Sequence, residues 1–188
     1  MTKEFILTVR KEVAPAEIVD NTVTVNDGET EIVIDTTNVE DLMAIDVPSS
    51  VADDEIISLN LGALVDEDTD SLTLTTNDLT LSRETSGGLD YEVVLPQGSV
   101  ITGSDNWNGV INLPTLKATT EVTPTAEAGV TKTVEVVIEV GFSQGQLNFT
   151  KAAKLTVPGQ AGKNAGYTDS EDVFHTIPEC TVAQIDDP

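Results

Sequence analysis

The stretch SLTLTTNDLTLS, Ser71 to Ser82, alternates leucine with threonine and serine. Successive side chains of a β-strand point to opposite faces of the sheet, so this alternation places the leucines of each half on one face. The preceding stretch EIISLNLGALV, Glu55 to Val65, shows the same alternation. Strands with one apolar face are typical of antiparallel sheets that bury one face and leave the other in water.

Period-two patterns and β-branched residues continue through the chain, with almost no helical periodicity. TVTVNDGETEIVID predicts strands over 22–25 and 31–34 that pair across a tight hairpin, because Asp27-Gly28 accepts positive φ angles. In TTNVEDLMAIDVPSS we expect one helical turn, with Asn38 as its cap and Pro48 as its terminator. The predicted fold class is all-β: one or more antiparallel β-sandwiches, Ig-like or jelly-roll-like, with little or no helix.

The length of 188 residues allows one large sandwich or two small ones. We expect a single β-sandwich domain over residues 14–188, preceded by an N-terminal strand over residues 1–13. A subdivision near Gly87–Gly88 is the alternative, because the acidic interval between Lys11 and Arg83, which holds no other basic residue, ends just before it.

The charge balance is strongly acidic, with 33 Asp and Glu against 9 Lys and Arg and a formal net charge of −24. Such a charge disfavours polyanionic partners, so we expect no binding to nucleic acid. We also expect no membrane insertion, because no apolar run approaches the roughly 18 residues of a membrane-spanning helix. The N-terminus differs from the rest, since Lys3, Arg10 and Lys11 lie in the first eleven residues and the next basic residue is Arg83.

Catalytic machinery is not indicated. The chain has one histidine, His175, and one cysteine, Cys180. This excludes Ser-His-Asp or Cys-His catalysis unless His175 itself serves, and it gives no tetrahedral zinc set. We therefore expect a protein that is not an enzyme.

Calcium is the one cofactor that the sequence favours, because hard cations bind clusters of carboxylate and carbonyl oxygens. Asp66, Asp68 and Asp70 alternate in the loop DEDTDS and are the candidate ligands. The loop is not an EF-hand, since Ser71 replaces the needed glycine and Asn77 replaces the bidentate glutamate. A solvated acidic turn is the alternative interpretation.

Trp107 is the only tryptophan and lies in the polar loop GSDNWNGV. An exposed indole there would stack on a sugar or anchor a partner. The alternative is that Trp107 folds back and closes the end of the sandwich core.

A turn and a later strand in the C-terminal half carry a family resemblance. A strand with the pattern Val-x-x-Pro-x-Gly leads to a further strand, and a Phe-x-Lys-x-x-x-Leu-x-Val-Pro segment precedes a tyrosine strand. This half resembles the ZU5-type β-sandwich modules of surface and extracellular proteins. The resemblance implies a structural or adhesive surface module, and FHT at 174–176 does not supply the autoproteolytic signature of related domains. The matching residues are Val93, Pro96, Gly98, Phe149, Lys151, Leu155, Val157, Pro158 and Tyr167.

Together these features predict a structural protein of the cell surface or the extracellular space that assembles with copies of itself into filaments or layers. The N-terminal strand would leave its own domain and pair with a neighbour, with Phe5, Leu7 and Val9 filling pockets and Arg10 and Lys11 meeting an acidic surface. The alternative for this strand is pairing within its own sheet. The alternative function is a calcium-dependent adhesin or a carbohydrate-binding module.

Overall fold

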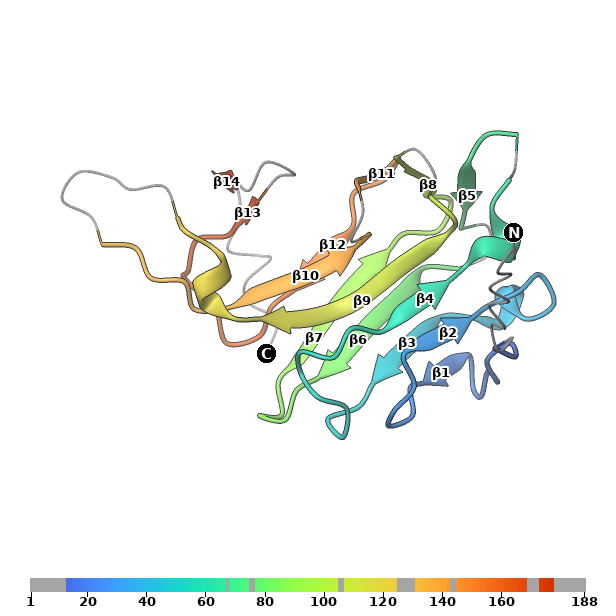
Figure 1. The fold of residues 1–188 in the computed structure, drawn as a ribbon, viewed down its shortest axis with the longest axis horizontal. Helices are drawn as coiled ribbons and strands as arrows, with labels where there is room; N and C mark the ends of the chain where they lie inside the picture. The colour runs from blue at the N-terminus through green and yellow to red at the C-terminus, as the bar shows by residue number, and fades with distance from the viewer. Residues whose placement is uncertain are drawn as a thin grey trace, which may run out of the picture.

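The computed structural model describes residues 13–66, 68–74, 77–104, 107–124, 131–142, 145–168 and 173–177. Within them the chain forms short strands and three 3₁₀ helices of one turn each: η1 (Val39–Asp41), η2 (Gly62–Leu64) and η3 (Thr119–Glu121). Figure 1 shows how the strands are arranged. The predicted all-β class with little helix is confirmed.

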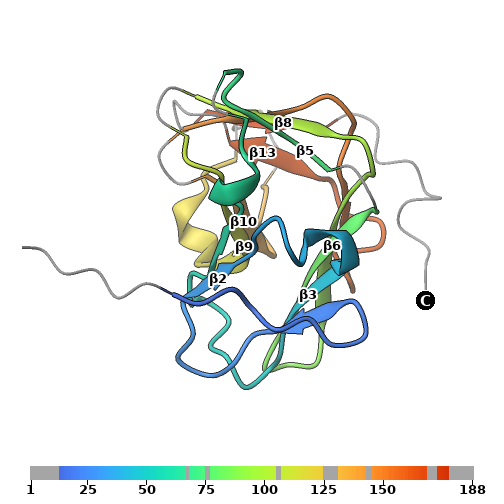
Figure 2. The same ribbon diagram turned by 90° about the vertical axis from the view of Figure 1, so that its right-hand side faces the viewer.

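Two sheets face each other across the core. The strand order of the first sheet is β1 (Thr22–Thr24), β3 (Ala44–Val47), β6 (Leu79–Glu84), β7 (Asp90–Leu95) and β12 (Lys154–Thr156). The strand order of the second sheet is β10 (Val137–Gly141), β9 (Val110–Lys117), β4 (Ser58–Asn60) and β2 (Glu31–Val33). Strands β6 and β7 contact β9, and Figure 2 shows the two layers from the end. The sandwich architecture is therefore present.

Two smaller units complete the described structure. A third sheet has the order β11 (Leu147–Phe149), β8 (Val100–Gly103) and β5 (Ser71–Thr73). Strands β13 (Gly166–Thr168) and β14 (Phe174–Thr176) form an antiparallel pair. In Figure 1 the third sheet lies at upper right, and β13 and β14 lie at the left.

The first four strands alternate between the two main sheets, and this gives parallel pairs where the sequence predicted antiparallel ones. Strand β1 pairs parallel with β3, β3 pairs parallel with β6, and β2 pairs parallel with β4. Each of these neighbours is reached by a passage through the opposite sheet, so the chain returns running in the same direction. Periodicity in the sequence reports which face is buried but does not report which strand is the neighbour.

The hairpin predicted for residues 22–34 is wrong. A turn is present, since Gly28 has a φ of 77° and Glu29 N donates a hydrogen bond to the Asn26 carbonyl at 3.0 Å. However, β1 and β2 belong to different sheets, so this turn carries the chain across the sandwich. Val23 and Ile32 are both buried in this arrangement, as they would be in a hairpin. The same burial pattern therefore fits a hairpin within one sheet and a connection between two sheets, and it could not distinguish them.

The predicted helical turn is present as η1, which follows Asn38. The Asn38 side chain does not cap it, because its oxygen accepts from Asp35 N at 3.1 Å and its amide donates to the Ala16 carbonyl at 3.0 Å. Pro48 does not terminate η1, since strand β3 lies between them.

Two turns that contain glycine connect strands in different ways. Gly98, with a φ of 71°, lies in the turn that leads from β7 in the first sheet to β8 in the third, where Ser99 N donates to the Pro96 carbonyl at 3.0 Å. Gly87 and Gly88 lie in the tight turn between β6 and β7, which pair along six residues each. The chain at Gly87–Gly88 therefore stays within one sheet.

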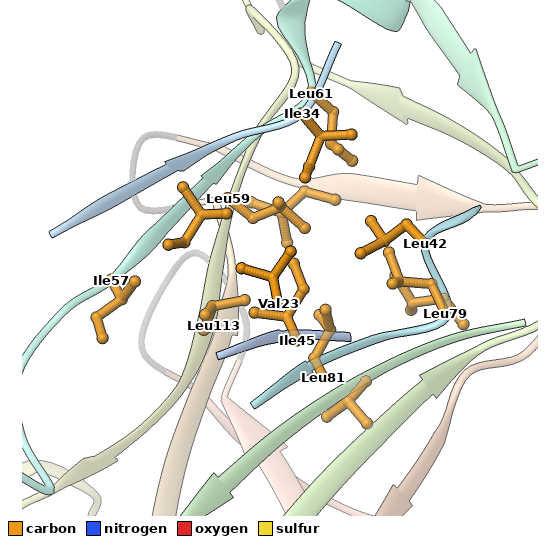
Figure 3. Packing of buried hydrophobic residues seen from close by; sticks show 14 of the residues in the cluster. Val23, Ile34, Leu42, Ile45, Ile57, Leu59, Leu61, Leu79, Leu81 and Leu113 are labelled. Carbon is orange, nitrogen blue, oxygen red and sulfur yellow. The ribbon is translucent and has the colours of Figure 1, made fainter. Parts of the chain in front are cut away.

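The core is formed by rows of side chains that run across the strands. Val23, Ile45, Leu81 and Val93 are register partners on β1, β3, β6 and β7, and all are at most 5% exposed. The second sheet contributes a facing row from β2, β4 and β9, which consists of Ile32, Leu59 and Ile111. Figure 3 shows buried side chains of both sheets pointing into the space between them.

Candidate functional site

The first core row continues beyond the buried residues to an exposed one. Leu155 on β12 is the register partner of Val93, so it occupies the next position of the row on the core face. Yet Leu155 is 50% exposed, whereas Val93 is 5% exposed. Among the described residues, the row therefore ends at a side chain that the facing sheet covers only in part.

The facing wall comes from the edge of the second sheet. Strand β10 pairs with β9, and its register shifts between Glu139 and Gly141. Val140 and Phe142 line the open space from this side. The exposure of Val140 shows that this edge, too, is incompletely covered.

Together these elements border an apolar cavity of about 300 Å³, here named the edge groove. Leu147 and Phe149 of β11 form part of its wall, and Phe149 is exposed to solvent. The described residues that line it are all apolar or glycine: Leu81, Val93, Leu95, Ile111, Val140, Gly141, Phe142, Gly145, Leu147, Phe149, Ala153 and Leu155.

Free strand edges surround the edge groove. Strands β10, β11 and β12 each stand at the end of the strand order of their sheet. Within the residues that the structure describes, each of them pairs along one side only. A sheet edge presents backbone N–H and C=O groups that are ready to pair with another extended segment. The groove thus combines an apolar lining with unpaired backbone.

Arg83 is the residue whose structural role the sequence analysis missed. It is fully buried and is the only buried charged side chain among the described residues. Its guanidinium donates hydrogen bonds to the carbonyl oxygens of Pro114, of Ala52 at 2.7 Å and of Glu55 at 2.7 Å. Arg83 therefore connects β6 of the first sheet to the 52–55 loop and to β9 of the second.

The surroundings of Arg83 are acidic. Burial lowers the pKa of the Arg83 guanidinium below its ordinary value, while the carboxylates of Asp53, Glu55 and Asp54 oppose this shift. Asp53 also accepts hydrogen bonds from the backbone N and the hydroxyl of Ser86, each at 2.9 Å. The Arg83 guanidinium is thus bonded to backbone carbonyls of both segments, and its visible role is to join the sheets.

Trp107 lies in the core instead of at the surface. Its side chain is 5% exposed, and its indole N–H donates to the Val110 carbonyl at 2.8 Å. A Cβ atom at Gly103 would lie 2.1 Å from the Cβ of Trp107, so the indole packs directly over this glycine of β8. Stacking on a sugar needs an open aromatic face, which the buried ring does not present. The position agrees with the alternative interpretation, in which Trp107 closes the end of the core.

The acidic loop around Asp66, Asp68 and Asp70 forms a turn held by internal hydrogen bonds. Asp66 Oδ1 accepts from Asp68 N at 2.9 Å and from Thr69 N at 3.2 Å, and Asp70 has a positive φ of 47°. In the described ranges, which omit Glu67, no three His, Cys, Asp or Glu side chains are grouped to hold a metal. The calcium site stays a prediction that this geometry does not strengthen.

The predicted partner-binding residues of the N-terminal segment lie outside the described residues. These are Phe5, Leu7, Val9, Arg10 and Lys11. Cys180 also lies outside them. His175 is on β14 and stacks on Tyr167 of β13, with ring centroids 5.1 Å apart.

Comparisons with protein-family models, with curated proteins and with solved structures found no match to this chain. The resemblance to ZU5-type modules therefore stays a prediction. A search of the described residues for a helix long and apolar enough to cross a membrane found none. The sequence did not predict the edge groove. Among the described residues, it is the surface best suited to a functional contact.

Proposed function

We propose that this chain is a non-catalytic structural protein of the cell surface or the extracellular space that assembles with copies of itself. The observation that carries the proposal is the edge groove, an apolar cavity bordered by free strand edges. Contiguous exposed apolar surface is uncommon on a monomer and marks contact sites.

The strongly negative net charge of the protein affects how its copies can associate. A formal net charge of −24 keeps molecules apart through mutual repulsion, so association needs a specific attractive surface. Burial of apolar surface stabilises a contact by about 25 cal/mol per Å², and this contribution does not weaken with screening by salt. The edge groove supplies such a surface, and the free strand edges beside it add directional hydrogen bonding.

A matched pair of substitutions tests the proposal. Leu155 in the groove and Leu89 in the turn between β6 and β7 are 50% and 40% exposed, so Leu155→Glu and Leu89→Glu place the same charge at two exposed leucines. Sedimentation velocity and negative-stain electron microscopy over a range of concentrations would measure assembly, with circular dichroism as the check on folding. We expect the wild type and Leu89→Glu to assemble and Leu155→Glu to stay monomeric.

A wild-type protein that remains a single chain at every concentration would refute self-assembly. Equal assembly of all three proteins would show that association uses a different surface, and the groove would lose its proposed role.

A further inference from the structure

We infer that the edge groove receives the N-terminal segment, residues 3–11, of a second copy of this chain, as an added strand beside β10. The inference rests on the proposed self-assembly and names its occupant.

The groove has the position of a missing strand. Strand β10 is the last strand of the second sheet, and its outer edge borders the cavity. A further strand beside β10 would continue that sheet and would face Leu155, the exposed end of the core row in the first sheet. Alternate side chains of such a strand would point into the cavity, because successive strand residues point to opposite faces.

The N-terminal segment has the pattern that this position requires. Phe5, Leu7 and Val9 alternate along KEFILTVRK and would lie on one face of an extended strand. The cavity of about 300 Å³ is about twice the ~150 Å³ of an apolar cavity that accepts a benzene ring. It therefore has room for two or three apolar side chains of this kind.

The charges favour β10 over β12 as the strand that pairs with the segment. On the β12 side, Lys151 and Lys154 would repel a basic segment. On the β10 side, Glu139 lies 3.0 Å from Lys117 Nζ, so the local charge is balanced. Lys3, Arg10 and Lys11 would thus meet a Lys117 that is already paired with Glu139 beside β10, while the acidic body attracts the segment at long range.

The described chain begins at the opposite edge of the same sheet. Ala16 N donates to the Val33 carbonyl at 2.8 Å, so the chain enters beside β2, whereas the groove lies beside β10. The twelve preceding residues span up to about 40 Å when extended, so the segment is long enough to leave its own edge and reach the groove of a neighbouring copy. A contact between two different surfaces is heterologous, and repeated from copy to copy it builds an open chain of molecules.

Complementation between two full-length variants tests the occupant. Leu7→Asp places a charge in the inserting segment and leaves the groove intact, whereas Leu155→Glu places a charge in the groove and leaves the segment intact. We expect each variant alone to be monomeric at concentrations at which the wild type assembles. The concentration at the midpoint of assembly should rise by at least about tenfold, which corresponds to about 1.4 kcal/mol. Mixed in equal amounts, they should form a complex of two copies and stop there, because only one groove and one segment remain competent. Mass photometry would measure this.

Thr8→Asp is the matched control, since it adds the same charge at the neighbouring position on the opposite face of the strand. It should assemble as the wild type does. If Leu7→Asp assembles like the wild type while Leu155→Glu does not, the groove has another occupant: the inference falls and the proposed function stands. Equal impairment by Leu7→Asp and Thr8→Asp would refute the insertion of alternate side chains. A wild type that never assembles would remove both proposals.

Discussion

Arg83 on β6 and Pro114 on β9 are joined across the sandwich, because Nε of Arg83 donates a hydrogen bond to the Pro114 carbonyl oxygen. The same guanidinium reaches the carbonyl oxygens of Ala52 and Glu55, so one side chain satisfies backbone acceptors from two segments. Buried carbonyl groups without a partner are costly. The connection therefore depends on the forked shape of arginine as well as on its charge.

Replacing Arg83 should destabilise the protein strongly. Arg83→Met keeps an apolar stem but leaves these backbone carbonyls without donors, and we expect a loss of about 3–5 kcal/mol in the free energy of unfolding. Arg83→Lys should lose nearly as much, since a single ammonium group cannot reproduce the fork. Urea denaturation followed by Trp107 fluorescence would measure both. A loss below about 1 kcal/mol for Arg83→Met would show that the bonds contribute little.

The alternation in the sequence indicates that Arg83 is buried, but this was not predicted, because arginine side chains are usually exposed. Leu79, Leu81 and Arg83 are at alternate positions of one strand, and the two leucines were correctly assigned to the buried face. The same alternation places Arg83 on that face. The isolation of Arg83 in an acidic stretch was noticed, but its partners are backbone carbonyls, which leave no signal in a sequence.

The edge groove lay beyond sequence reasoning for a different reason. The sequence pattern indicates an ordinary core position for Leu155, which belongs to a short strand. Its register with Val93 confirms that it faces the core. Its exposure follows from the absence of a described strand opposite to it, which depends on the strand order. The parallel pairs β1–β3, β3–β6 and β2–β4 were missed for the same reason, because alternation fixes a face and leaves the neighbour undetermined.

Gly103 should tolerate no side chain. A Cβ atom there would lie 2.1 Å from Trp107 Cβ, so Gly103→Ala must displace the indole from the core. We expect a loss of about 1–3 kcal/mol in the free energy of unfolding, together with a red shift of tryptophan emission. Gly87→Ala is the control, since its nearest neighbour, Thr85 Oγ1, would be at an ordinary 3.8 Å. Equal stability of the two variants would show that the loop around Trp107 adapts freely.

Calcium should stabilise this protein no more than magnesium does. Asp66 Oδ1 is engaged by two backbone N–H groups, and the described residues group no three carboxylates. Both ions should raise the melting temperature equally, because they screen the same net charge of −24. Thermal unfolding in matched millimolar chloride salts would measure this. A further rise with calcium alone, lost in Asp68→Asn, would instead support the calcium-dependent alternative.

Asp90 should oppose folding at neutral pH. Partial burial raises its pKa from 3.8, and the nearby charges of Asp46 and Glu84 add to the shift. Because the folded state disfavours ionised Asp90, Asp90→Asn should be more stable than the wild type at pH 7, by less than about 1 kcal/mol at this exposed site. The advantage should disappear as the pH falls through the folded-state pKa of Asp90, where the wild type takes up a proton.

Ionised Asp35 should stabilise the folded state, in contrast to Asp90, since hydrogen bonds from Thr37 lower its pKa. Asp35→Ala should therefore be less stable at pH 7, and its deficit should shrink below pH 3.8. Melting temperatures of both variants between pH 7 and pH 3 would measure the two trends, and parallel curves for all three proteins would contradict them.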